Sequence, residues 1–234
     1  MYAEDTIAAI STAPGEGGIG IVRISGSESL PILNRIFKSP RGRDTMDFKT
    51  YTLRYGYIVN PDDGKAIDEV LVSYMKSPHS YTREDIVEIS CHGGMVPVRR
   101  ILEAALKSGA RLAQPGEFTK RAFLNGRIDL SQAEAVIDMI RSKTDDSMDA
   151  AMEQLKGGLS LKINAIRESL LDVMSHIDAS IDFPEEGIED VLYHDLKSEC
   201  EKASSQVNEL IKSASAGRIL REGLNTVIIG KPNV

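Results

Sequence analysis

Tryptophan is absent from this chain of 234 residues, and aromatic residues make up only 5% of it. This scarcity argues against a surface on which the bases of single-stranded nucleic acid stack. Basic residues are not in excess either, since the formal net charge is −7. The chain as a whole therefore lacks the positive charge that drives binding to phosphate backbones, and any contact with nucleic acid must be local or shared with parts outside this sequence.

Cysteine is also rare, because Cys91 and Cys200 are the only two and lie far apart. They cannot build a disulfide framework or a CxxC site, so a reducing compartment fits best. No run approaches the roughly 18 apolar residues of a membrane span, and the N-terminus lacks the basic and apolar segments of a secretion signal. These absences favour a soluble cytoplasmic protein without a membrane partner.

Short segments of strand and helix character alternate in the first half of the chain, with turn residues between them. Ser27 is the expected N-cap of the first helix, and Gly109 is the expected C′ residue of the second. The third and fourth strands are expected to form a hairpin. The predicted strands are residues 6–12, 19–24, 51–59, 68–75 and 85–91, and the predicted helices are residues 27–37 and 96–107.

From Phe118 onward the strand signal nearly vanishes, which predicts a change to an all-helical domain. Residues 131–134 have the form of a capping box that opens a helix, and Gly157-Gly158 breaks the next helix. Apolar residues at 163, 166, 170, 173 and 177 then follow a 3-4-3-4 spacing and form one seam. We interpret this seam as packing within a helix bundle, and the alternative is an intermolecular coiled coil.

Proline at 184 is predicted to end that helix, because proline cannot continue the hydrogen-bond ladder. A last helix is expected over residues 194–216, followed by a strand over residues 226–229. Residues 227–234 have the form of a buried strand that opens into a phosphate loop of the type GxxxxGK[ST], with Gly230 as its first glycine.

Residues 15–20 match the dinucleotide fingerprint GxGxxG, but the alternating residues 19–24 that follow are typical of a strand and not of a helix. We therefore predict a tight glycine turn between paired strands, with Arg23 on the second strand. Cys91 and His92 are adjacent on a strand and should point to opposite faces, so we interpret Cys91 as a buried residue and not as an activated thiolate.

Residues 115–127 predict a short helix that carries Lys120 and Arg121, ends at Gly126 and is followed by Arg127. Such a charge cluster is often a solvated face. This one lies at the expected domain junction, where ligand clefts tend to form, so a ligand-binding role stays equally open.

Several of these motifs, taken in order, resemble the MnmE (TrmE) family of tRNA-modification GTPases, and they span nearly the whole chain. The motifs that carry the resemblance are residues 5–9, 17–26, 81–88, 92–94, 115–130, 179–184 and 230–233.

The resemblance implies an α+β protein with three parts. Residues 1–118 would form a folate-binding and dimerisation domain, an α/β unit similar to the folate-binding unit of the glycine-cleavage aminomethyltransferase. Residues 119–222 would form the first part of an all-α helical domain, and residues 223–234 the start of a GTPase domain cut off within its phosphate loop.

The resemblance also implies the activity and the partners. The whole protein would be a homodimer through its N-terminal domains and would form a heterotetramer with MnmG, a flavin enzyme. Together they would add an aminomethyl-type group to the wobble uridine of certain tRNAs. The one-carbon unit would come from 5-formyltetrahydrofolate or a related tetrahydrofolate, under the control of GTP hydrolysis that depends on K⁺ and Mg²⁺.

The family's folate contacts fall on Arg23, Glu88 and Arg127 of this sequence. A carboxylate such as Glu88 can accept from the ring N–H and the exocyclic amino group of a pterin at once. Arginines suit the carbonyl oxygens and the glutamate carboxylates of the same ligand, because the guanidinium is a permanently charged, planar fork of donors. The alternative for Arg23 and Glu88 is a structural ion pair between adjoining strands.

Asn233 matches the phosphate-loop asparagine that contacts nucleotide and K⁺ in the family. The lysine and serine that would follow it are not in this sequence, so we expect the chain neither to hold Mg–GTP well nor to hydrolyse it, and we nominate no catalytic residue. Two alternatives to the family's function are a stand-alone folate-dependent aminomethyl transferase and a helical scaffold without ligand.

Overall fold

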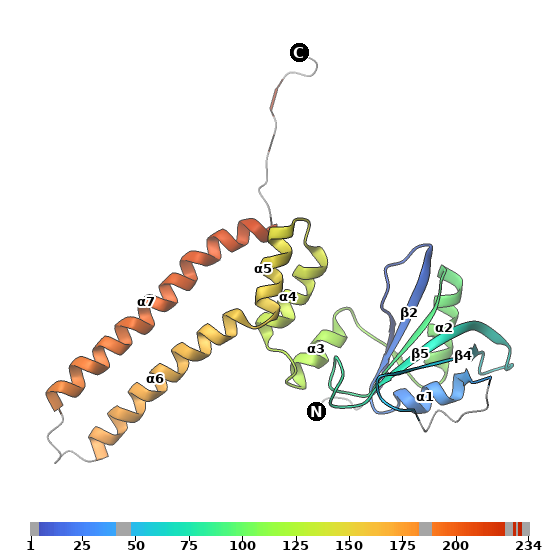
Figure 1. Cartoon of the computed structure of the whole chain (residues 1–234), viewed down its shortest axis with the longest axis horizontal. Helices are drawn as coiled ribbons and strands as arrows, with labels where there is room; N and C mark the ends of the chain where they lie inside the picture. The colour runs from blue at the N-terminus through green and yellow to red at the C-terminus, as the bar shows by residue number, and fades with distance from the viewer. Residues whose placement is uncertain (1–4, 41–47, 183–188, 223–226, 228, 231–234) are drawn as a thin grey trace. The chain divides into compact units, whose positions relative to one another are not determined.

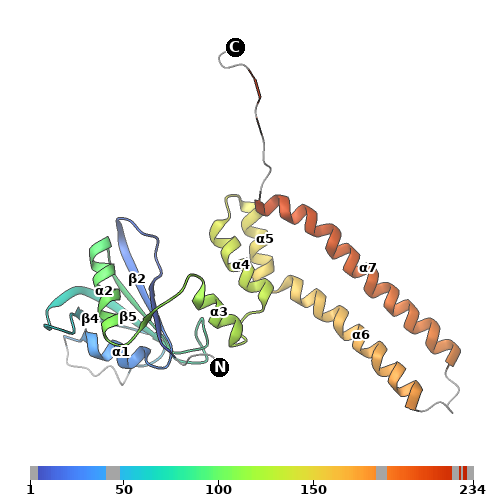
Figure 2. The same ribbon diagram turned by 180° about the vertical axis from the view of Figure 1, so that it is seen from behind.

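A computed structural model describes residues 5–40, 48–182, 189–222, 227, 229 and 230 (Figures 1 and 2). The contacts divide the chain into an N-terminal unit, Met1–Ile128, and a helical unit, Asp129–Val234. The combination of a mixed sheet with helices in the first unit and helices in the second confirms the predicted α+β class.

The described part of the N-terminal unit contains a seven-stranded sheet in the order β3-β4-β5-β6-β2-β1-β7. The pairing is antiparallel throughout, except that β7 runs parallel to β1. The strands are β1 Ile7–Ile10, β2 Gly17–Ser25, β3 Phe37–Lys38, β4 Thr52–Val59, β5 Ala66–Met75, β6 Ile86–Gly93 and β7 Arg111–Leu112, and the helices are α1 Ser29–Ile36, α2 Met95–Lys107 and α3 Glu117–Leu124.

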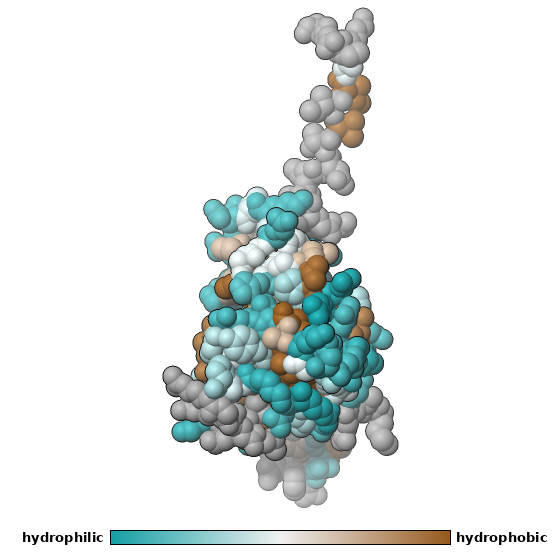
Figure 3. Space-filling model, turned by 90° about the vertical axis from the view of Figure 1, so that its right-hand side faces the viewer, coloured by the Kyte–Doolittle hydropathy of each residue, from teal (hydrophilic) through white to brown (hydrophobic). Residues whose placement is uncertain are grey.

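The two faces of this sheet differ because side chains alternate along each strand. Val22, Ile24, Val87 and Ile89 point to one face and pack with α1 and α2 in a single hydrophobic core. We call this the helix-covered face and the other the open face. Helices α1 and α2 lie on one side of the sheet and α3 on the other (Figures 1 and 2). On the side nearest α2 and β4, hydrophilic residues cover most of the surface (Figure 3).

Glycines allow β2 and β6 to approach each other and α2 closely. A Cβ atom added to Gly93 would collide with the carbonyl oxygen of Gly17, and one added to Gly20 would collide with the side chain of Val98. The glycine-rich segment after β1 is therefore a connection between paired strands, as predicted. It does not lead into a helix N-terminus, so it is not a dinucleotide fingerprint.

The element boundaries confirm most of the predicted strands and helices, with one correction at the first helix. Helix α2 ends at Lys107, and its C-cap Ser108 is followed by Gly109 with a φ of +113°, as a C′ glycine requires. Ser27, in contrast, does not cap α1: the N-cap is Glu28, without a side-chain hydrogen bond. The hydroxyl at the start of this helix belongs to Ser29, which donates to the carbonyl oxygen of Asp85 at 2.9 Å and joins α1 to the sheet.

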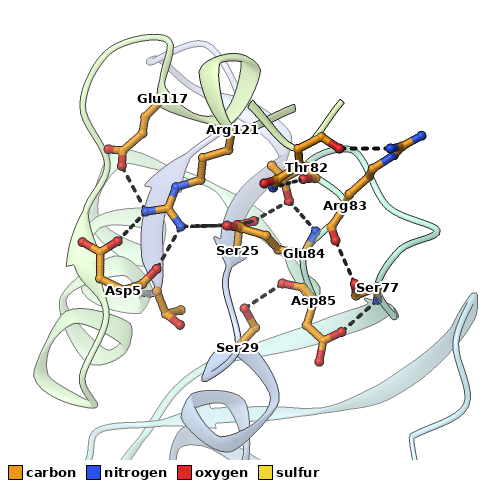
Figure 4. Close-up of polar contacts among 12 residues, drawn as sticks. Asp5, Ser25, Ser29, Ser77, Thr82, Arg83, Glu84, Asp85, Glu117 and Arg121 are labelled. Carbon is orange, nitrogen blue, oxygen red and sulfur yellow. Dashed lines mark hydrogen bonds and ion pairs between the residues drawn. The ribbon is translucent and has the colours of Figure 1, made fainter. Parts of the chain in front are cut away.

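Arg121 of α3 is almost fully buried, with 2% of its side chain exposed. Its Nη2 lies 2.6 Å from Asp5 Oδ1 and 3.1 Å from Glu117 Oε1, and its Nη1 lies 3.1 Å from Glu84 Oε1 (Figure 4). Arg111 adds a second cation, 2.6 Å from both Asp5 and Glu117. We call these five residues the buried ion network. Arg121 therefore belongs neither to a solvated face nor to a ligand site. This corrects the prediction for Arg121, which the sequence places with Lys120 in a surface charge cluster.

The pKa values in this network follow from the pairing. Hydrogen bonds from Arg111 lower the pKa of Glu117 to about 2, against the opposing effect of its burial. The same arginine is the first cause of the lowered pKa of Asp5. Both carboxyl groups are therefore charged in the folded protein at neutral pH. The network holds α3 on β7 and on the segment before β1. The N-terminal unit therefore continues through Ile128, past the boundary predicted at residue 118.

The described helices of the second unit are α4 Leu130–Arg141, α5 Asp145–Leu155, α6 Gly158–Asp182 and α7 Glu189–Glu222. The capping box of α4 is formed by Asp129 and Gln132 and not by the predicted residues 131–134. The reason is that Asp129 Oδ1 accepts from the Gln132 amide at 2.9 Å while Gln132 Oε1 accepts from the Asp129 amide at 2.9 Å. None of the described helices combines the length with the apolar content that a bilayer crossing needs.

The predicted seam lies along α6, which packs against α7. Ile166 and Val173 are buried, whereas the flanking seam residues at 163, 170 and 177 stay between 39% and 46% exposed. The predicted break at Gly157-Gly158 is confirmed by the end of α5 and the start of α6. Val227 and Ile229 do not lie in a strand, and the rest of the strand predicted over 226–229 is outside the described residues, as is the predicted stop at 183–184.

We expect Arg121→Met to lower the free energy of unfolding of the N-terminal unit by about 3–5 kcal/mol, because three carboxylates lose a buried cation. Urea unfolding followed by tyrosine fluorescence measures this change. Arg99→Met is the matched control, since Arg99 forms an exposed pair with Glu103 on α2 and should cost less than about 0.5 kcal/mol. An equal effect of the two substitutions would contradict the assigned role of the network.

Candidate functional site

Arg23 and Glu88 face each other directly on neighbouring strands. They are register partners of β2 and β6, and both lie on the open face because their neighbours in sequence enter the core. Arg23 Nε lies 2.8 Å and Nη2 lies 2.7 Å from Glu88 Oε1. The two side chains are 28% and 25% exposed, so the pair is reachable from solvent. Both contacts go to Oε1, and among the described residues no hydrogen bond reaches Oε2.

Tyr81 connects this pair to the third predicted residue. The guanidinium carbon of Arg127 lies 4.8 Å from the centre of the Tyr81 ring, and that of Arg23 lies 5.7 Å from the same point. Arg23 is also 5.6 Å from the ring centre of Phe118. These distances are within the range of cation–π attraction. The structure thus brings all three predicted residues together, and we call Arg23, Tyr81, Glu88, Phe118 and Arg127 the arginine–tyrosine cluster.

Arg127 is placed by the way in which α3 ends. The amide of Arg127 donates to the Ala122 carbonyl at 2.9 Å, and the amide of Gly126 donates to the Phe123 carbonyl at 2.9 Å. These two bonds form a Schellman motif, which needs a residue with positive φ at the C′ position. Gly126, at φ +69°, meets that need. The predicted helix stop at Gly126 is confirmed, and it directs Arg127 toward Tyr81.

Tyr81 lies on the loop between β5 and β6, and hydrogen bonds fix this loop on both sides. The Tyr81 hydroxyl is 2.9 Å from Thr119 Oγ1 on α3. The next residue, Thr82, is fully buried, with its hydroxyl 2.7 Å from that of Ser25 and its carbonyl accepting from Asn125 Nδ2 at 2.6 Å. The ring is therefore held in place by β2 and by α3 without any ligand.

The cluster combines two permanent positive charges with one carboxylate and two aromatic rings on a partly exposed surface. Such a set suits a planar heterocycle that offers N–H donors and also carries carbonyl or carboxylate oxygens. Arg23 and Glu88 pair with each other, so the geometry also fits the alternative of a purely structural cross-strand ion pair.

Reasoning from the sequence missed Tyr81 and Phe118. Both lie inside segments that carry the family resemblance. The available signal was the position in the chain: Phe118 lies in the first turn of α3, Arg127 follows the end of this helix, and Tyr81 begins the segment 81–88.

Cys91 and His92 point to opposite faces, as predicted. Cys91 is buried, and its thiol donates to the Gly20 carbonyl at 3.3 Å. Burial is the main reason why its pKa rises to about 11. His92 is exposed, with Nδ1 2.7 Å from Asp68 Oδ1, and this hydrogen bond raises the pKa of the imidazole. The thiol is therefore protonated at neutral pH and separated from the histidine, which rules out an activated pair.

We expect Cys200, which is exposed, to react with an aromatic disulfide reagent at pH 8 while Cys91 stays unmodified until the protein unfolds. The reason is that the reactive species is the thiolate, and the raised pKa and burial of Cys91 suppress it. Thiol titration should detect one reactive thiol per chain in buffer and two in denaturant, and the control Cys200→Ser should lose the thiol that reacts in buffer. Fast release of two equivalents in buffer would contradict this assignment.

Asn233, predicted to contact nucleotide and K⁺, lies outside the described residues. Within the described residues, no group of three or more histidine, cysteine, aspartate or glutamate side chains is arranged to hold a metal ion.

The fold and the site define a class of α+β protein, in which an N-terminal unit carries a charged cluster on the open face of its sheet and a helical unit follows. Sequence comparison gives the family. Residues 6–127 match the family described as GTP-binding protein TrmE N-terminus, and residues 130–227 match the family described as MnmE helical domain. The chain belongs to the MnmE (TrmE) family.

Curated relatives agree with this assignment. The chain is 54% identical over its whole length to a protein of Alkaliphilus oremlandii named tRNA modification GTPase MnmE, of which it covers 51%. The same name belongs to a protein of Clostridioides difficile that is 54% identical over the whole chain, and to one of Geobacillus thermodenitrificans that is 54% identical over 98% of the chain. The chain covers 50% of each of these two proteins, so it spans about half the length of the curated relatives it matches.

Proposed function

We propose that the N-terminal unit binds a tetrahydrofolate that carries a one-carbon unit, such as 5-formyltetrahydrofolate, in the arginine–tyrosine cluster. The observation that carries this proposal is that Arg23, which pairs with Glu88, and Arg127 converge on the ring of Tyr81. These three charged residues come from β2, β6 and the end of α3, so no local sequence pattern brings them together.

Each charged group has a partner on such a ligand. Glu88 accepts from the pterin ring N–H and the exocyclic amino group, and its Oε2 is the oxygen that Arg23 does not contact. Arg127, which is exposed, binds a carboxylate of the glutamate tail. Arg23 remains beside Glu88 and offers its outer N–H groups to a carbonyl oxygen. The ion pair of the free protein thus becomes part of the binding surface.

The whole protein of which this chain is a part acts, in our proposal, as a GTP-hydrolysing tRNA modification protein in the cytoplasm. The name of the relatives, tRNA modification GTPase, supports this activity. It works with MnmG on the wobble uridine of tRNA, and its GTPase domain uses K⁺ and Mg²⁺, with Asn233 at the nucleotide and the K⁺ ion. The folate site supplies the one-carbon unit for that modification.

Calorimetric titration of 5-formyltetrahydrofolate into the chain tests the folate proposal. We expect saturable binding that Arg127→Ala weakens roughly tenfold to a hundredfold, the usual cost of a lost hydrogen bond to a charged group. Arg99 lies on α2, on the other side of the sheet, so Arg99→Ala should bind folate like the parent. GTP serves as a ligand control that should not bind.

Glu88→Gln provides the second arm of the same experiment, because the amide keeps the size of the side chain but loses the ability to accept two hydrogen bonds with a negative charge. Parent-like affinity of this variant would remove Glu88 from the site. The absence of folate binding by the folded parent would reject the proposed site as a whole.

We also propose that the unit forms a homodimer through the uncovered half of its open sheet face. Tyr55 on β4 and Leu71 on β5 are cross-strand partners there and are 46% and 45% exposed, and Leu53 beside them is 67% exposed. The register places Leu71 opposite Ser90, which neighbours Glu88 on the same face of β6. This patch is therefore continuous with the arginine–tyrosine cluster. A second copy of the chain would cover these apolar side chains.

Sedimentation equilibrium of the parent and of Leu71→Lys tests the dimer. A lysine on this patch should shift the protein toward monomer, because the interface would have to bury an unpaired charge. Met95→Lys introduces the same charge at an exposed position of α2 and should leave the dimer intact. A parent that is monomeric, or a Leu71→Lys variant that dimerises like the parent, would reject this surface.

A further inference from the structure

The ring of Tyr81 is the point where the two arginines of the proposed folate site meet. Arg127 and Arg23 both lie within cation–π distance of this one ring, at 4.8 Å and 5.7 Å. The two side chains reach it from different elements, because Arg23 belongs to β2 and Arg127 follows α3. Two like charges that converge on one spot repel each other, so their convergence needs a compensating attraction.

We propose that Tyr81 is a positioning residue of this site: its ring holds both guanidinium groups in place, so that Arg127 can bind a carboxylate of an anionic ligand while Arg23 stays beside Glu88. The proposal rests on the folate function above and adds a determinant for the acidic tail of that ligand. It assigns the effect to the aromatic ring and not to the hydroxyl group, because only the ring faces the two cations.

The environment of Tyr81 distinguishes it from a packing residue. Its ring is half-buried and does not belong to the hydrophobic core between the sheet and the helices α1 and α2. Its hydroxyl is 2.9 Å from Thr119 Oγ1, and Thr82 beside it is anchored to Ser25 and Asn125. The loop is thus fixed before the ligand arrives, so binding does not have to bear the entropy cost of ordering the ring.

The ring also supplies an attraction that the ion pair of the site does not provide for Arg127. Glu88 compensates Arg23 directly, but among the described residues no carboxylate pairs with Arg127. The negative face of the Tyr81 ring therefore supplies the attraction that orients the Arg127 guanidinium. A carboxylate of the ligand can then bind Arg127 without first breaking a salt bridge.

Titration of 5-formyltetrahydrofolate into the parent, Tyr81→Phe and Tyr81→Leu tests the proposal. Tyr81→Phe keeps the ring and should bind within about twofold of the parent. Tyr81→Leu loses the ring and should bind roughly fivefold to tenfold more weakly, as expected for a partly exposed cation–π contact. A tetrahydropterin that lacks the aminobenzoylglutamate tail should show no difference between the three proteins, because it carries no carboxylate.

A double-mutant cycle with Arg127→Ala separates positioning from a general structural effect. If the ring acts through Arg127, Tyr81→Leu should weaken binding by less than about threefold in the Arg127→Ala background. Fully additive losses, or an equal loss for the tail-less pterin, would overturn the proposal. A parent that binds no folate would overturn the proposed function and this inference together, whereas a binding parent with unaffected Tyr81→Leu would overturn this inference only.

A tryptophan reporter provides a measurement that does not depend on the folding of Tyr81→Leu. The chain contains no tryptophan, so Tyr81→Trp introduces a single one that keeps an aromatic ring at the site. Its fluorescence should change saturably with added 5-formyltetrahydrofolate. Tyr193→Trp, at an exposed position of α7, is the control for light absorbed by the ligand. The same response from both variants would overturn the placement of Tyr81 at the ligand.

Discussion

The guanidinium of Arg121 is the centre on which the N-terminal unit depends. It is buried among Asp5, Glu84 and Glu117, which come from the segment before β1, from the loop before β6 and from α3 itself. A buried charge is tolerable only when partners replace its lost water, so the network stabilises the fold as a complete set and penalises the loss of any member. Because the network fixes α3, it also fixes Phe118 in the first turn of this helix and Arg127 just beyond its end.

The candidate site follows from this anchoring together with the pleat of the sheet. Alternation along β2 and β6 sends Arg23 and Glu88 to the open face, in register with each other. The anchored helix α3 then covers part of that face, and its Schellman ending directs Arg127 toward Tyr81. Three segments that are far apart in the sequence thus build one cluster, and none of them could form it alone.

The sequence predicted the five longer strands of the sheet, the hairpin of β4 and β5 and the stop signals at Gly109 and Gly126, because each depends on local periodicity or on a backbone conformation that favours glycine. It missed the two-residue strands β3 and β7, which are too short to show a period. It misjudged Arg121, because nothing in a run of charged residues reveals which one is buried. It assigned caps to Ser27 and to residues 131–134, whereas the N-cap of α1 is Glu28, without a side-chain hydrogen bond, and Asp129 with Gln132 forms the capping box of α4.

The sequence by itself determined the α+β class, the family and the identity of the three charged residues of the proposed site, since motifs and alternation are local properties. Only the tertiary structure decided that Arg23 and Glu88 form an ion pair, that Arg127 reaches them through Tyr81, and that Arg121 is structural. The physical reason is that pairing, burial and ring contacts join residues tens of positions apart, and their energies depend on distances that no local pattern encodes.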